Sequence, residues 1–143
     1  MKLLSKYEIP DIVLLDYFLR FSIALGFLSA VLDRFGFWPE SVSAWGNWEN
    51  FVNYTGVLNP WFPSVLIPFI AILATVTEVI FSLCLLIGYK KALAAKASGV
   101  LLLMFAAAMI INTGVKGVFD YSVFIASAAA FSLSWLSKSI SNE

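Results

Sequence analysis

The sequence predicts an all-α integral membrane protein. Four transmembrane helices are expected to form an up-down-up-down bundle, with a tryptophan-rich outer loop that contains a short interfacial helix. Hydrophobic residues make up 61% of the chain and charged residues only 13%, whereas soluble domains carry about 25% charged residues. Four apolar segments reach the length of about 20 residues that a spanning helix needs. Short links between the later segments favour antiparallel neighbours.

The whole chain is expected to form one transmembrane domain, residues 1–143, without a second folding unit. The four spans are expected at about residues 12–35, 64–88, 92–113 and 117–137. The connection between the first two spans is the longest, and it holds four of the five tryptophans.

Basic residues predict which side of the membrane each end faces. One side carries six of them: Lys2, Lys6, Lys90, Lys91, Lys96 and Lys138. Only Arg34 and Lys116 lie on the other side. Because cytoplasmic loops are enriched in Lys and Arg, both termini are expected in the cytoplasm, and the tryptophan-rich connection then faces outward.

The residue inventory limits the chemistry that is available. Nine Lys and Arg residues balance nine Asp and Glu residues, so no net charge attracts nucleic acid. The chain has no histidine and one cysteine, Cys84. This excludes histidine-ligated haem or zinc, an intramolecular disulfide, and nucleophiles activated by histidine. No metal site is expected, and the sequence identifies no catalytic residue.

Two charged residues lie near the middle of adjacent spans, at matching estimated depths: Arg20 and Glu78. A charge near the bilayer centre costs at least ~2.5–3.5 kcal/mol and normally faces the bundle interior beside a partner. Asp16 lies four residues before Arg20, on the same helical face. We therefore expect Asp16, Arg20 and Glu78 to form a buried ion-pair chain. Either it only fixes the helix register, or it belongs to a proton-handling or ligand-binding site.

Polar residues at the outer ends of the spans are further ligand-binding candidates. They are Asp33, Asn112, Lys116, Asp120 and Tyr121. Antiparallel packing brings these ends to one mouth of the bundle. An apolar pocket with a few convergent polar groups is a typical ligand site.

The outer loop above this mouth is expected to contain a short helix over residues 43–52, with Ser43 as its N-cap. Trp45 and Trp48 share one face of that helix. Two alternatives remain open for these rings. They either anchor the loop among lipid headgroups, or form a lid over a cavity whose floor lies at the level of Arg20 and Glu78.

Several segments, in a fixed order, carry a resemblance to a known family. They are Gly26–Val31, Asp33–Gly36, Trp45–Asn47, Ala74–Glu78 and Asp120–Phe124. Together they resemble the DoxX family of small bacterial four-helix membrane proteins, from the first span into the fourth. The resemblance implies a multi-pass protein of the bacterial inner (plasma) membrane.

The family is named for its similarity to a subunit of a thiosulfate:quinone oxidoreductase. The resemblance therefore implies a membrane subunit or accessory of a quinone-linked redox or oxidative-stress system. It would bind a quinone or another hydrophobic small molecule near Arg20 and Glu78, beside a redox partner protein or in a homo-oligomer. The alternative is a non-enzymatic membrane protein that binds lipid or another membrane protein, with purely structural buried charges.

Overall fold

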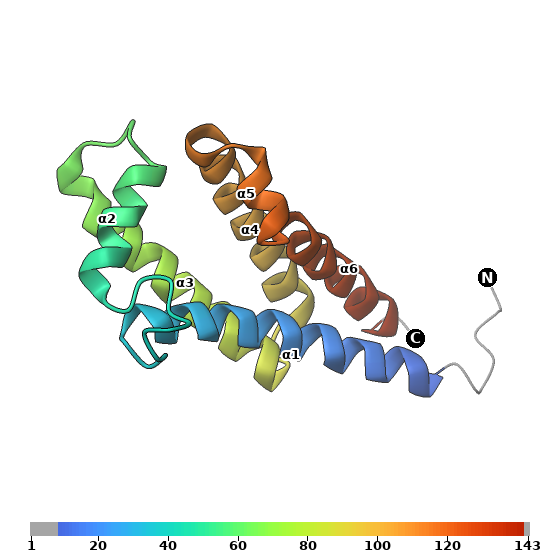
Figure 1. Cartoon of the computed structure of the whole chain (residues 1–143). Coiled ribbons are helices and arrows are strands. Elements are labelled where there is room, and N and C mark those ends of the chain that lie inside the picture. The colour runs from blue at the N-terminus through green and yellow to red at the C-terminus, as the bar shows by residue number, and fades with distance from the viewer. Residues whose placement is uncertain (1–8, 142–143) are drawn as a thin grey trace.

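The computed structural model describes residues 9–141, and all regular structure within that range is helical (Figure 1). In chain order the elements are α1 (Ile9–Arg34), α2 (Trp48–Leu58), the 3-10 helix η1 (Ser64–Leu66), α3 (Ile67–Ile87), α4 (Lys91–Thr113), α5 (Val115–Asp120) and α6 (Val123–Ser141). Three segments are long and apolar enough to cross a membrane: Asp11–Arg34, Ser64–Ile87 and Lys91–Thr113. These helices indicate a membrane protein, because hydrocarbon is the natural solvent for their exposed apolar side chains.

The expected fourth span, 117–137, is wrong as one continuous helix. The structure ends α5 at Asp120 and begins α6 at Val123. Ser122 has a φ of 54°, which lies in the left-handed region and cannot continue a right-handed helix. Its N–H bonds to the carbonyl of Phe119 at 2.9 Å, which closes the last turn of α5. That α6 crosses the membrane as a fourth span stays a prediction.

The long helices lie in two groups joined by α1. In Figure 1, α1 runs along the bottom of the view. Helices α2 and α3 lie towards the left of the view, and α4, α5 and α6 lie towards the right. Helix α1 packs on both α3 and α6, and α4 packs on α6 and α3. We call the end that carries α2 and α5 the α2 end. The opposite end carries the turn from α3 to α4, and we call it the α3–α4 end.

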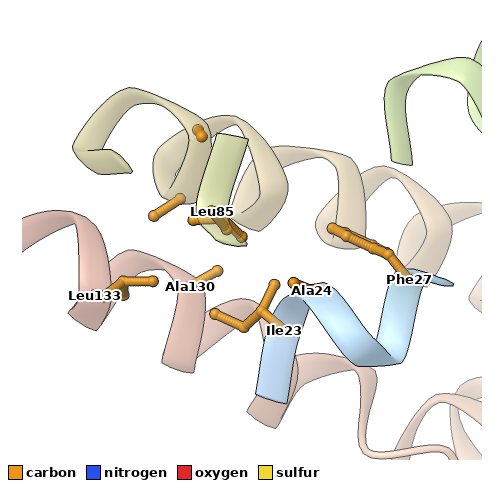
Figure 2. Close-up of a cluster of buried hydrophobic side chains, with 8 residues drawn as sticks. Ile23, Ala24, Phe27, Leu85, Ala130 and Leu133 are labelled. Carbon is orange, nitrogen blue, oxygen red and sulfur yellow. The ribbon is translucent and has the colours of Figure 1, made fainter. Parts of the chain in front are cut away.

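The main core lies where α1, α3, α4 and α6 meet, and Figure 2 shows it. Its buried side chains are Ile23, Ala24, Phe27, Leu85, Ala94, Ala95, Ala130 and Leu133. Small residues bring α4 and α6 close together. Ser127 Oγ donates to the Gly99 carbonyl at 2.9 Å, and Ser134 Oγ donates to the Ala92 carbonyl at 2.7 Å. These bonds fix how α6 lies against α4.

The connection between α1 and α3 folds differently from the expectation in one respect. Its helix, α2, begins at Trp48 and takes Asn47 as its N-cap, with the Asn47 side chain accepting from the Asn50 N–H at 2.8 Å. The assignment of Ser43 as the N-cap is therefore wrong. Ser43 instead donates its hydroxyl to Asp33 at the end of α1. The short polar side chains of both residues suit a cap, so composition alone does not choose between them.

Candidate ligand-binding site at the α2 end

The most deeply buried ion pair joins Arg34, the last residue of α1, to Glu78 in the middle of α3. Arg34 Nη1 lies 2.5 Å from Glu78 Oε2, and the two side chains are 3% and 2% exposed. The same guanidinium nitrogen donates to Thr75 Oγ1 at 2.7 Å. Among the described residues, Arg34 Nε has no hydrogen-bond partner. The charges of the pair therefore neutralise each other, but its hydrogen bonding is incomplete. A buried donor without a partner lowers the stability of the fold.

Two aromatic rings from the connection cover the Arg34 guanidinium. Its Cζ lies 3.8 Å from the centroid of the Phe51 ring and 5.4 Å from that of Trp45. The two rings meet edge to face with centroids 5.1 Å apart. An arginine over an aromatic face gains a cation–π attraction that strengthens when water is excluded. The space beneath these rings is thus occupied by Arg34.

Asp33, the residue before Arg34, holds this aromatic cover in place. Its carboxylate accepts hydrogen bonds from the backbone N–H groups of Ala44 and Trp45, each at 2.9 Å, and from the hydroxyl of Ser43. Bonds to a charged acceptor are stronger than neutral ones. Two adjacent residues therefore hold the same loop. Asp33 binds its backbone, and the Arg34 guanidinium contacts the ring of Trp45.

An open groove of about 410 Å³ runs along α1 beside this cover. Its lining residues are Gly26, Ser29, Ala30, Asp33, Trp38, Val42, Ala44 and Trp45. Trp38 is fixed across the groove by a 3.1 Å hydrogen bond from its Nε1 to the Ser29 carbonyl. Trp45 forms one wall of the groove and also contacts Arg34. An apolar molecule in the groove would therefore lie one side chain away from a buried cation.

The expected pair of Arg20 and Glu78 is wrong. Arg20 donates from Nε to the Leu85 carbonyl at 2.7 Å and from Nη2 to the Leu86 carbonyl at 3.0 Å. Ser82 Oγ, which donates to the Ala24 carbonyl at 3.2 Å, sets the same register. Arg20 therefore lies beside the C-terminus of α3, about two helical turns from Glu78.

The expected contact between Asp16 and Arg20 is confirmed, at 3.5 Å. Asp16 also binds two groups that sequence reasoning missed. Lys91 Nζ lies 3.0 Å from its carboxylate, and Ser137 Oγ lies 3.3 Å from it. Lys91 follows the turn after α3, so it approaches Asp16 because the C-terminus of α3 lies beside this part of α1. This second cluster belongs to the α3–α4 end and not to the groove.

The other candidates at the α2 end lie apart from Arg34. Asn112 donates to the Leu58 carbonyl at 2.6 Å, which ties the end of α4 to the end of α2. Lys116 and Asp120 pair with each other at 2.5 Å on the surface. These three residues therefore serve the helix ends rather than the groove.

Two further aromatic candidates have distinct places. Trp48 stacks on Phe35, with ring centroids 5.8 Å apart. Tyr121 is highly exposed. Burial raises the pKa of the Tyr54 phenol above its ordinary value, and the neighbouring Tyr121 raises this pKa further. Of the aromatic candidates from the sequence, only Trp45 lines the groove.

The residues that the structure describes include no group of three or more His, Cys, Asp or Glu side chains that would hold a metal ion. Comparisons of the chain with protein-family models, with curated proteins and with solved structures give no match. The functional interpretation therefore depends on the geometry of the groove and the buried charges.

Proposed function

We propose that the chain is a DoxX-like protein of the bacterial inner membrane, with four spans and both termini in the cytoplasm. It binds a hydrophobic small molecule of the quinone class at the α2 end, as a subunit or accessory of a quinone-linked redox or oxidative-stress system. The observation that carries the proposal is the double role of Trp45, which is both a wall of the groove and a cover over Arg34.

A quinone needs an apolar slot for its ring and a polar group that contacts its carbonyl oxygens. The groove beside Trp45 supplies the slot, and its openness gives entry from the lipid. Arg34 supplies a buried donor behind Trp45, since its Nε has no partner among the described residues, and a ligand that displaces the Trp45 ring reaches it. Glu78, held against Arg34, supplies a carboxylate that accepts a proton when the quinol form of the ligand is oxidised. The proposal thus moves the polar contact from Arg20 to Arg34.

Electron transfer to such a ligand needs a second protein. With no histidine and one cysteine, the chain has neither a histidine-held metal nor a dithiol pair to carry electrons. We therefore assign the chain the binding step, and assign the electrons to a partner. The redox class comes from the family resemblance, whereas the binding site comes from the geometry.

The test uses the purified full-length protein with an added short-chain ubiquinone analogue that carries a photoreactive group. We expect crosslinks to peptides of α1 and of residues 38–45, and a loss of most crosslinking in Trp45→Ala. Trp61→Ala is the matched control, because Trp61 is exposed in the same connection and lies outside the groove. Equal crosslinking in the two variants would refute the site.

The near-complete burial of Arg34 and Glu78 favours a second candidate function. Both side chains are at most 3% exposed, so the pair also suits a purely structural role in a non-enzymatic protein that binds lipid or another membrane protein. If this second function is correct, the quinone analogue has no specific site at the α2 end. Trp45→Ala then lowers thermal stability but leaves the crosslinking of the analogue unchanged.

A further inference from the structure

A second groove lies at the other end of the molecule, between α1 and α6. It has a volume of about 510 Å³, within the range of about 300–1,000 Å³ that ligand sites occupy. Its lining residues are Leu15, Leu19, Phe131, Ser132, Trp135 and Leu136. It is open along its length and almost entirely apolar, so it suits a hydrocarbon chain that lies against the protein surface.

One acidic and one basic side chain mark the polar end of this groove. Helices α1 and α6 run antiparallel, and the 3.3 Å contact of Ser137 with Asp16 sets their register. In this register Asp11, in the first turn of α1, and Lys138, in the last turn of α6, both lie beyond the lining residues of the groove, about 6 Å apart along the helix direction. Both side chains are exposed. Trp135 is 72% exposed beside them, and exposed tryptophans favour the depth of lipid headgroups.

We propose that this groove binds one phospholipid with an amine-bearing headgroup. One acyl chain lies between Leu19 and Phe131, the phosphate contacts Lys138, and the ammonium group contacts Asp11. From Phe131 to Lys138 the helix rises about 10 Å, which places the charged pair beyond the apolar part of the groove. A zwitterionic phosphoethanolamine group complements one acid and one base. A phosphoglycerol group satisfies Lys138 but brings its negative charge near Asp11.

The experiment reconstitutes the full-length protein into vesicles of equal phosphatidylethanolamine and phosphatidylglycerol. It then measures the lipids retained after mild detergent extraction by native mass spectrometry. We expect about a threefold preference for phosphatidylethanolamine, the size typical of one exposed charge pair. Ser132→Phe fills the groove and should remove the retained lipid. Ala107→Phe adds the same ring to an exposed position on α4 and should retain it.

Charge variants test the headgroup separately. Asp11→Asn should keep the retained lipid but abolish the preference for the amine headgroup, and Lys138→Gln should lower retention of both lipids. Lys90→Gln, an exposed lysine at the same end, is the control and should change neither. Equal retention of the two lipids by the unmodified protein, or unchanged retention in Ser132→Phe, would overturn the proposal. Neither outcome bears on the quinone site, which lies at the α2 end.

Discussion

The two ends of the molecule each bury a charged cluster, but they neutralise it in different ways. At the α2 end, Arg34 meets one carboxylate, Glu78, and two aromatic rings. At the α3–α4 end, Arg20 meets Asp16 and two backbone carbonyls, while Lys91 gives the same carboxylate a second cation. The first cluster therefore depends on one ion pair, whereas the second distributes its contacts over several groups.

This difference indicates that the Arg20 cluster stabilises the fold, whereas the Arg34 cluster is the candidate ligand site. The Arg20 guanidinium donates to two carbonyls in the last turn of α3, where the regular helical hydrogen bonds end, and a cation is favourable there because of the helix dipole. Its hydrogen bonds are thus explained by the fold. Arg34 Nε has no such partner among the described residues, and the ring of Trp45 separates the guanidinium from a groove. In the proposed site, a ligand that displaces the Trp45 ring would reach this unpartnered donor.

The largest expected effect comes from removing the charge of Glu78. Glu78→Gln leaves Arg34 buried without its counter-ion, which should lower stability by about 3–5 kcal/mol. Thermal unfolding in detergent, followed by circular dichroism, measures the change. Asp120→Asn breaks an exposed pair instead and should leave the transition unchanged.

Replacing both partners tests whether the loss of stability comes from the unpaired charge. The Arg34→Met, Glu78→Met double variant should recover most of the lost stability, because exchanging a whole buried pair for apolar side chains is often neutral. A double variant as unstable as Glu78→Gln would mean that the two residues stabilise the fold through separate contacts.

A smaller effect is expected at the other cluster. Asp16→Asn should lower stability by about 1–3 kcal/mol, the range for a buried group that loses a partner. Arg20 keeps the carbonyls of Leu85 and Leu86, and the Lys91 side chain is 24% exposed and reaches water. The same unfolding measurement applies, with Asp11→Asn as the control on the exposed face of α1. A loss as large as that of Glu78→Gln would remove the contrast between the two ends.

The smallest effect is expected at Gly88, in the turn after α3 that lies beside the Arg20 side chain. Gly88 has a φ of 78°, and a Cβ added there would lie 3.0 Å from Arg20 Nη2. Gly88→Ala should therefore cost about 1–2 kcal/mol, the penalty of left-handed backbone for a residue with a side chain. Gly26→Ala is the matched control: it is helical, and nothing lies within 4 Å of its Cβ position. If Gly88→Ala proved as stable as Gly26→Ala, the turn would be more adaptable than the structure indicates.

Local features of the fold were predictable from the sequence. Apolar length located the segments that end near Arg34, Ile87 and Thr113. The spacing of Asp16 and Arg20 predicted their contact, because residues four apart meet on a helix. The break at Ser122 was not predictable in this way, since apolar residues on both sides of residues 120–122 together reach the length of one span, and the backbone conformation ends the helix.

The register between helices was not predictable, and the pairing error at Glu78 follows from it. Hydropathy locates the middle of a span, but close packing decides which residues of two helices meet. The contacts of Ser82 with Ala24 and of Arg20 with Leu85 shift α3 along α1 relative to the span midpoints. Arg34 was missed for a related reason. It ends its helix, where a long side chain usually reaches water, and here it extends back over α3 instead.

The most direct test of this account is a double-mutant cycle on thermal unfolding of the full-length protein in detergent. It combines Glu78→Gln with Arg34→Met in one arm and with Arg20→Met in the other. We expect a coupling energy of about 0.5–3 kcal/mol with Arg34, and additivity within about 0.5 kcal/mol with Arg20. Coupling with Arg20 and additivity with Arg34 would contradict the register of α1 on α3, and with it the site beside Trp45.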